Sequence, residues 1–151
     1  MTKIILIAAT AGLLSVGVRA AANPALMGSV KSVYTDYLKI QASLANDSLN
    51  GVAANATAIA KAVNGDSMKM LPTAVATEAE TLAKASNLKS ARVAFKPLSN
   101  SLIKYLADRN ARSAYVQVYC PMADASWLQS GKSVRNPYYG RGDLTCGEIK
   151  N

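Results

Sequence analysis

Four stretches of the chain, at 26–45, 49–63, 75–83 and 88–106, repeat apolar residues at steps of three and four positions. This spacing puts the apolar side chains on one face of an α-helix. Half of the residues are hydrophobic, many of them alanine, and only 6% are aromatic, which favours packed helices over a β-sandwich. Because the links between the stretches are short, neighbouring helices should be antiparallel. The sequence therefore predicts a mainly α protein, an up-down four-helix bundle.

Several residues predict where these helices begin or bend. Asn46 or Asp47 can cap the second helix by accepting N–H groups from its first turn. Pro72 suits the first turn of the third helix, where a missing N–H costs nothing, and Asn87 is expected to cap the fourth. Pro97 lies inside the fourth stretch and predicts a kink or a split of that helix.

The N-terminal segment has the composition of a secretory signal peptide. A short start with Lys3 precedes an apolar stretch at 4–18, which is shorter than the roughly 20 residues of a membrane span. The alanines at 20–22 then fit the small-x-small pattern of a signal-peptidase site. We therefore predict a signal peptide at 1–22 and a single mature domain at 23–151 without a membrane span, in a periplasmic or secreted protein. The alternative is an uncleaved N-terminal anchor.

The sequence contains no histidine. This removes the commonest general base, every Ser-His or Cys-His nucleophile pair, and the commonest metal ligand. Nothing in the sequence marks two acidic residues as a paired acid and base. We therefore predict that the protein is not an enzyme.

The positive charge lies in the second half of the chain. The formal net charge of +8 would fall to +6 without 1–22; residues 23–83 carry 4 basic and 5 acidic side chains, whereas 84–151 carry 11 basic and 4 acidic. A basic half can attract nucleic acid or anionic surfaces. An exported protein rarely meets nucleic acid, and the basic residues are not interleaved with aromatic stacking platforms, so no nucleic-acid partner is expected. Two interpretations stay open, a solvated face and a docking surface for an acidic partner.

The character of the sequence changes after residue 110. Residues 114–119 are β-branched and aromatic and predict a short strand. From residue 120 onward the chain is rich in Pro, Gly, Asn and Ser, and it contains both cysteines and the only tryptophan, Trp127. Irregular segments of about 30 residues are unusual in compact domains and are often functional. We expect the C-terminal motif segment, 114–151, to fold over the bundle, with Trp127 packed between the two.

Motifs in both halves of the chain carry a family resemblance. The C-terminal motifs are Cys-Pro-Met-Ala at 120–123, Trp-Leu-Gln at 127–129, Asn-Pro-Tyr-Tyr-Gly at 136–140 and Cys-Gly at 146–147. In this order they resemble a bacterial family known as the domain of unknown function number thirty-three forty-seven. Tyr-x-x-Tyr-Leu-x-Ile-Gln at 34–41 and Ala-Arg-x-x-Phe-Lys-Pro-Leu-Ser at 91–99 are similar to its first and fourth helices. The resemblance covers roughly 30–148.

The resemblance implies an exported protein that occurs alone or fused to periplasmic adaptor subunits of copper and silver efflux systems. It implies heavy-metal handling, with efflux or copper-handling proteins as partners. A soft ion such as Cu(I) prefers thiolate and thioether sulfur. Cys120 and Met122 alternate along one extended segment, so both side chains can point the same way. Cys146 would complete a three-sulfur site.

A disulfide between Cys120 and Cys146 is the competing interpretation. Exported proteins meet an oxidising compartment, and two cysteines make one bridge. That bridge would close a loop of about 27 residues and contribute roughly 3.5 kcal/mol through loop entropy. Two functions therefore stay open. One is a periplasmic accessory domain that binds Cu(I) or a similar soft metal through Cys120, Met122 and Cys146. The other is a structural or protein-interaction module with the disulfide and no metal.

Overall fold

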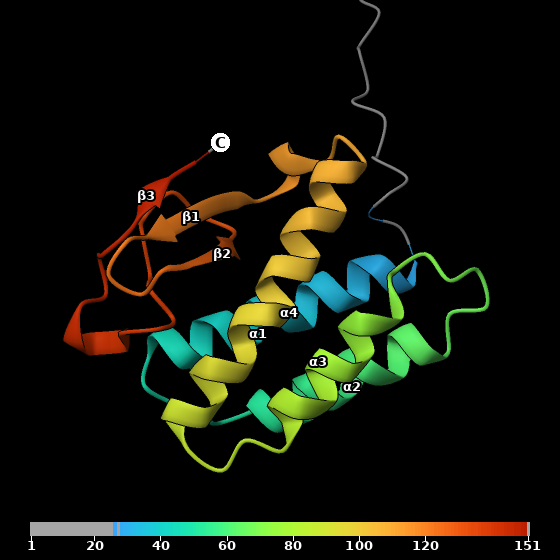
Figure 1. Ribbon diagram of the computed structural model, residues 1–151, viewed down its shortest axis with the longest axis horizontal. Coiled ribbons are helices and arrows are strands. Elements are labelled where there is room, and N and C mark those ends of the chain that lie inside the picture. The colour runs from blue at the N-terminus through green and yellow to red at the C-terminus, as the bar shows by residue number, and fades with distance from the viewer. Residues whose placement is uncertain (1–25, 27, 151) are drawn as a thin grey trace, which may run out of the picture.

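The computed structural model describes residue 26 and residues 28–150 (Figure 1), so the predicted signal peptide lies outside the described residues. The described part contains the four predicted helices: α1 (Ser29–Ala45), α2 (Val52–Asn64), α3 (Thr73–Ala83) and α4 (Leu88–Asp108). Short elements follow: η2 (Arg112–Ala114), β1 (Val116–Cys120), β2 (Ala125–Gln129), η3 (Gly140–Gly142) and β3 (Glu148–Ile149). None of the helices in this part is both long and apolar enough to cross a bilayer.

The start of α4 is confirmed and the predicted cap of α2 is wrong. The Asn87 carboxamide oxygen accepts the Ser90 N–H at 2.9 Å, and the Ser90 hydroxyl accepts the Asn87 N–H in return. By contrast, α2 begins after Gly51, and Asn46 instead ends α1. Asp47 has a φ of 56°, a left-handed conformation that Asp tolerates in turns. This turn frees the Asp47 carboxylate for contacts elsewhere in the molecule.

Pro97 does not split α4, which continues through it. Proline has no N–H to donate to the carbonyl of Val93, four residues earlier. Both Val93 and Pro97 are exposed, so water can replace the missing donor. The neighbouring side chains of Phe95 and Leu98 are fully buried, and this burial offsets the lost hydrogen bond.

The helices pack in sequence, with α1 against α2, α2 against α3 and α3 against α4. Helices α1 and α4 meet through aromatic side chains. The rings of Tyr37 and Phe95 stack with centroids 5.0 Å apart, and the Tyr34 hydroxyl donates to the Leu102 carbonyl at 2.7 Å. Figure 1 shows α4 crossing α1 at a steep angle. The mainly α fold is therefore confirmed, whereas the up-down arrangement of the bundle is not.

The C-terminal motif segment contains more regular structure than the sequence indicates. It forms an antiparallel sheet in the order β2-β1-β3, and β1 lies two residues beyond the start of the predicted strand. A tight turn links β1 to β2; Asp124 there has a φ of 43°, and its N–H donates to the Pro121 carbonyl at 3.1 Å. The expectation of one strand and an irregular remainder is thus wrong for β2 and β3. Strand β2 packs on α1 and α4 (Figure 1), and Trp127 within it is fully buried, as predicted.

Candidate functional site

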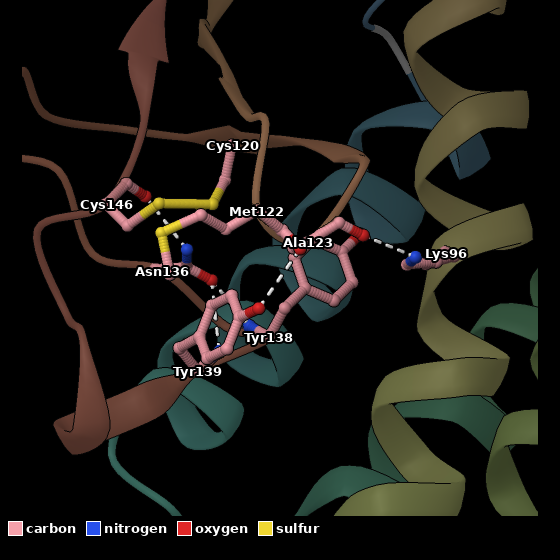
Figure 2. The surroundings of a disulfide bond; sticks show 8 residues. All are labelled: Lys96, Cys120, Met122, Ala123, Asn136, Tyr138, Tyr139 and Cys146. Carbon is pink, nitrogen blue, oxygen red and sulfur yellow. Dashed lines mark hydrogen bonds between the residues drawn. A yellow bond between two sulfur atoms is a disulfide. The ribbon is translucent and has the colours of Figure 1, made fainter.

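A disulfide joins the two ends of the C-terminal motif segment. Cys120 is the last residue of β1, and Cys146 lies two residues before β3 (Figure 2). Their Cα atoms are 5.8 Å apart, and Cys120 is fully buried. The disulfide interpretation of these two cysteines is therefore confirmed. The bridge encloses the turn after β1, strand β2 and the whole Asn-Pro-Tyr-Tyr-Gly motif.

The predicted Cu(I) ligands meet, but not as a donor set. Met122 is 65% exposed, and Figure 2 shows its side chain directed toward the disulfide. With Cys120 and Cys146 bonded to each other, no thiolate is left, and a single thioether remains. Within the described residues, no cluster of three His, Cys, Asp or Glu side chains could hold a metal ion. With the cysteines bonded to each other, these residues do not fit Cu(I), because Cu(I) prefers thiolate and thioether sulfur and a disulfide supplies no thiolate.

Asn136 fixes the turn that lies beside the disulfide. It is fully buried, and its side-chain oxygen accepts the N–H groups of Tyr138 at 2.8 Å and Tyr139 at 3.2 Å. Its side-chain nitrogen donates to the carbonyl of Cys146 at 2.8 Å. A buried amide with all these partners satisfied holds its loop in one conformation. Asn136 therefore connects the tyrosines of the motif directly to the bridge.

Arg92 on α4 ties the segment to the helices. Its Nε donates to the carbonyl of Pro137 at 2.8 Å, and its Nη2 donates to the carbonyl of Leu44 at 3.2 Å and to the carboxylate of Asp47. The backbone N–H of Arg141 donates to the same carboxylate at 3.0 Å. These hydrogen bonds, first that of Arg92 and then that of Arg141, hold the pKa of Asp47 below its usual value. Three segments far apart in sequence thus meet at one ion pair.

Gly140 is required beside this ion pair. Its φ is +56°, a conformation that side chains rarely adopt. A Cβ placed there would collide with the carboxylate of Asp47 and the guanidinium of Arg92. The glycine of the motif therefore lets the backbone approach the ion pair closely, and this approach sets the position of the preceding tyrosines.

An open groove lies where α4 faces the segment. It has a volume of about 600 Å³, and its lining combines apolar surface from Leu88, Val93, Ala123 and Tyr138 with the basic residues Lys89, Arg92 and Lys96. Val93 is 66% exposed although it is apolar. The Lys96 ammonium donates to the carbonyl of Ala123 at 2.6 Å and lies 6.0 Å from the centre of the Tyr138 ring (Figure 2). Lys96 therefore joins the two walls of the groove.

Tyr138 forms part of the groove, where its position is fixed by contacts on both its hydroxyl and its ring. Its hydroxyl donates to the carbonyl of Ser126 at 2.9 Å, and its ring lies edge-on to that of Trp127 with centroids 6.0 Å apart. Burial raises the pKa of Tyr138 well above its usual range, so the phenol stays protonated. The side chain supplies a fixed apolar wall and no ionisable group.

Sequence reasoning missed the residues that build this surface. In the sequence, Arg92, Lys96 and Asn136 are noticed only as members of the family motifs, and no role is assigned to them. Their hydrogen-bond partners are distant in sequence; Arg92 and Pro137, for example, are separated by 45 positions. The signal that could have found Asn136 is the grouping of a polar residue with one proline and two tyrosines at 136–139. The bridge itself, in contrast, was predicted residue by residue.

Comparison with known proteins finds one family. A family model described as a protein of unknown function (DUF3347) matches residues 33–114. The match runs from α1 to the end of η2 and stops before β1. No curated protein and no solved structure matches the chain.

Proposed function

We propose that this chain, which belongs to the DUF3347 family of proteins of unknown function, is a protein-interaction module. Its binding surface is the groove between α4 and the C-terminal motif segment. The observation that carries the proposal is an open, mostly apolar groove between two walls that are both held in place. A disulfide and Asn136 fix one wall, and an α-helix forms the other.

The exposed apolar side chains support a binding role. The exposed large hydrophobic residues of the described chain include Val93, which lines the groove, and Met122 and Tyr139, which are next in sequence to the groove residues Ala123 and Tyr138. The Tyr139 hydroxyl donates to the carbonyl of Met122 at 3.1 Å, so these two belong to one surface. Grouped exposed apolar residues, unlike scattered ones, are typical of interaction sites.

The compartment and the absence of catalysis form part of this proposal. A disulfide that anchors a segment is typical of proteins that work in an oxidising compartment, which supports a periplasmic or secreted location. The groove lining contributes ammonium and guanidinium groups and a phenol that stays protonated, and the sequence contains no histidine to act as a base. We therefore propose binding rather than chemistry at this surface.

Site-specific photo-crosslinking in producing cells tests the proposal. A benzophenone amino acid replaces Val93 in the groove, and in a matched variant it replaces Met68, which is 77% exposed and lies between α2 and α3. We expect a discrete protein adduct from position 93 and none from position 68. Equal adducts from both positions, or no adduct from position 93, would contradict a binding groove.

Heavy-metal handling, which the family resemblance implies, is a second candidate and concerns the reduced protein. It is favoured by the direction of the Met122 side chain, which lies toward both cysteine sulfurs (Figure 2). Reduction would give Cys120 and Cys146 as thiolate donors beside one thioether. Competition for Cu(I) against a chelator tests this. The reduced protein should take more Cu(I) from the chelator than the Cys120→Ser and Met122→Leu variants do. Identical titrations of all three proteins would exclude the site.

A further inference from the structure

We propose that the groove binds an acidic amphipathic segment of a partner protein. The partner's apolar side chains pack on Val93 and Ala123, and its carboxylates face Lys84 and Lys89. This inference rests on the proposed function and names the chemistry of the partner. It is carried by the coincidence of two features on one surface. These are a row of apolar side chains and a set of lysines whose charge no carboxylate of the described chain neutralises.

The groove is longer than a single pocket. A second hollow of about 480 Å³ lies beside it and shares Lys89 and Val93 in its lining. This second hollow extends over the turn between α3 and α4 and includes Lys84. Together the two hollows follow the first half of α4 from the α3–α4 turn to the β1–β2 turn. An elongated path of this kind suits a helical or extended peptide segment better than a compact small molecule.

The charged side chains that line the two hollows are all basic. Residues 81–107 contain five basic side chains and no acidic one. Arg92 is neutralised by Asp47, but Lys84 and Lys89 are exposed, and neither forms an ion pair among the described residues. Lys96 donates to a carbonyl, which leaves its positive charge uncompensated. Three lysines beside apolar surface therefore offer complementary partners for carboxylates.

The shape of the surface favours a peptide over a lipid bilayer. Proteins that bind membranes through apolar residues present them on a protruding helix face that enters the headgroup region. Here Leu88, Ala123 and Tyr138 line a hollow, together with the side chains of Lys89 and Lys96. An apolar side chain that enters the hollow must project from a narrow partner, as from an amphipathic helix.

A peptide display selection tests the inference without knowledge of the partner. A random library of peptides of about 16 residues, long enough for several helical turns, is selected on the oxidised full chain. Counter-selection uses Val93→Arg, which fills the apolar path at an exposed position. We expect the retained peptides to be enriched in Asp and Glu together with Leu, Ile or Phe. Retained peptides that are neutral or basic, or no peptide that distinguishes the two proteins, would overturn it.

Titration of the best peptide with charge-reversal variants completes the test. The double variant Lys84→Glu/Lys89→Glu should weaken binding by about tenfold or more, and the effect should shrink as salt is added. Lys31→Glu/Lys132→Glu makes the same charge change at two exposed lysines outside the groove, and it should change binding by less than about twofold. Equal loss in both double variants would mean that only net charge matters, and the groove inference would fail.

Two further outcomes show which of the two statements fails, this inference alone or the proposed function with it. If position 93 crosslinks to a partner but the selected peptides are not acidic, the interaction module stands and the acidic partner does not. If the protein binds vesicles of phosphatidylglycerol, loses that binding in Lys84→Glu/Lys89→Glu, and yields no groove-dependent peptide, the surface contacts a membrane and both statements are overturned.

Discussion

The four helices and the C-terminal motif segment are held in place by different forces. In the helices the buried side chains are almost all apolar, as at Phe95 and Leu102. In the segment a covalent bridge and buried polar groups such as Asn136 and Gln129 do much of the same work. Apolar burial is non-directional, so it fixes which face is inside. Hydrogen bonds and a disulfide are directional, and they fix the path of the loops that connect the short strands of the segment.

This difference has a consequence for the groove. Its helical wall would persist in any protein that forms α4, but its other wall exists only while the segment keeps one conformation. The groove is thus as stable as the weaker of its two walls. The following changes, ordered from the largest expected effect to the smallest, test whether the two regions fail separately.

Phe95→Ala should have the largest effect, because it removes a fully buried ring from the contact between α1 and α4. We expect a loss of about 3–5 kcal/mol in the free energy of unfolding, measured by urea denaturation followed by far-UV circular dichroism. Val93→Ala, two residues earlier on the same helix but exposed, should change stability by less than about 0.5 kcal/mol. Equal effects would contradict the packing of α1 on α4.

Removal of the bridge by Cys120→Ser/Cys146→Ser should loosen the segment and spare the helices. The bridge contributes about 3.5 kcal/mol to the free energy of unfolding through loop entropy. Hydrogen exchange should show faster exchange in β1 and β2 with protection retained in α2 and α3. The crosslink from position 93 should also be lost. Uniform loss of protection through all helices would mean that the two regions unfold as one unit.

Gly140→Ala tests the close approach of the segment to the Arg92–Asp47 ion pair. The positive φ and the collision of a Cβ with both charged groups predict a loss of about 2–3 kcal/mol. Gly142→Ala is the matched control, because a Cβ there meets no atom within 4 Å and needs no positive φ. Thermal denaturation of both variants measures the difference. A neutral Gly140→Ala would show that the segment can shift away from α4 at no cost.

The Asp47 carboxyl predicts how acid affects the junction of the two regions. Its pKa is lower in the folded protein than the usual value of 3.8, because Arg92 and the Arg141 N–H bind the ionised form. Its contribution to stability is therefore complete above that usual value and is lost as pH falls through the lower folded pKa. Asp47→Asn should lower the Tm near neutral pH and flatten its decline in acid. An unchanged acid profile would contradict this assignment.

The Glu78 carboxyl, which lies in α3, predicts a smaller dependence of stability on pH, in the opposite direction to that of Asp47. Its side chain accepts a hydrogen bond from Ser101 at 2.9 Å, but its other oxygen is buried without a partner, and desolvation raises its pKa. Ionisation therefore lowers stability as pH rises above the usual value of 4.5. Glu78→Gln should raise the Tm by about 1–2 °C near neutral pH. At low pH, where the acid is protonated in both states, the two proteins should melt together.

Much of the fold could be predicted from sequence, because it depends on local patterns. The three- and four-residue spacing gave the helices, and Asn87 marked the start of α4 because a capping box needs only residues three apart. The cap of α2 failed for a related reason. Asp47 resembles a cap in isolation, but its carboxylate is used by Arg92 and Arg141, which lie 45 and 94 positions away. Strand β2 was missed because its apolar residues are buried on both faces and do not alternate.

By itself, the sequence determined the helices, the region of the first strand and which disulfide the chain could form, since two cysteines allow only one intramolecular pairing. Only the tertiary structure decided that the bridge leaves Cu(I) without its thiolates, that α4 crosses α1, and that lysines of α4 meet Tyr138 and Ala123 in a groove. These features depend on contacts between residues tens of positions apart. Such contacts are set by how whole elements pack, and no local spacing encodes them.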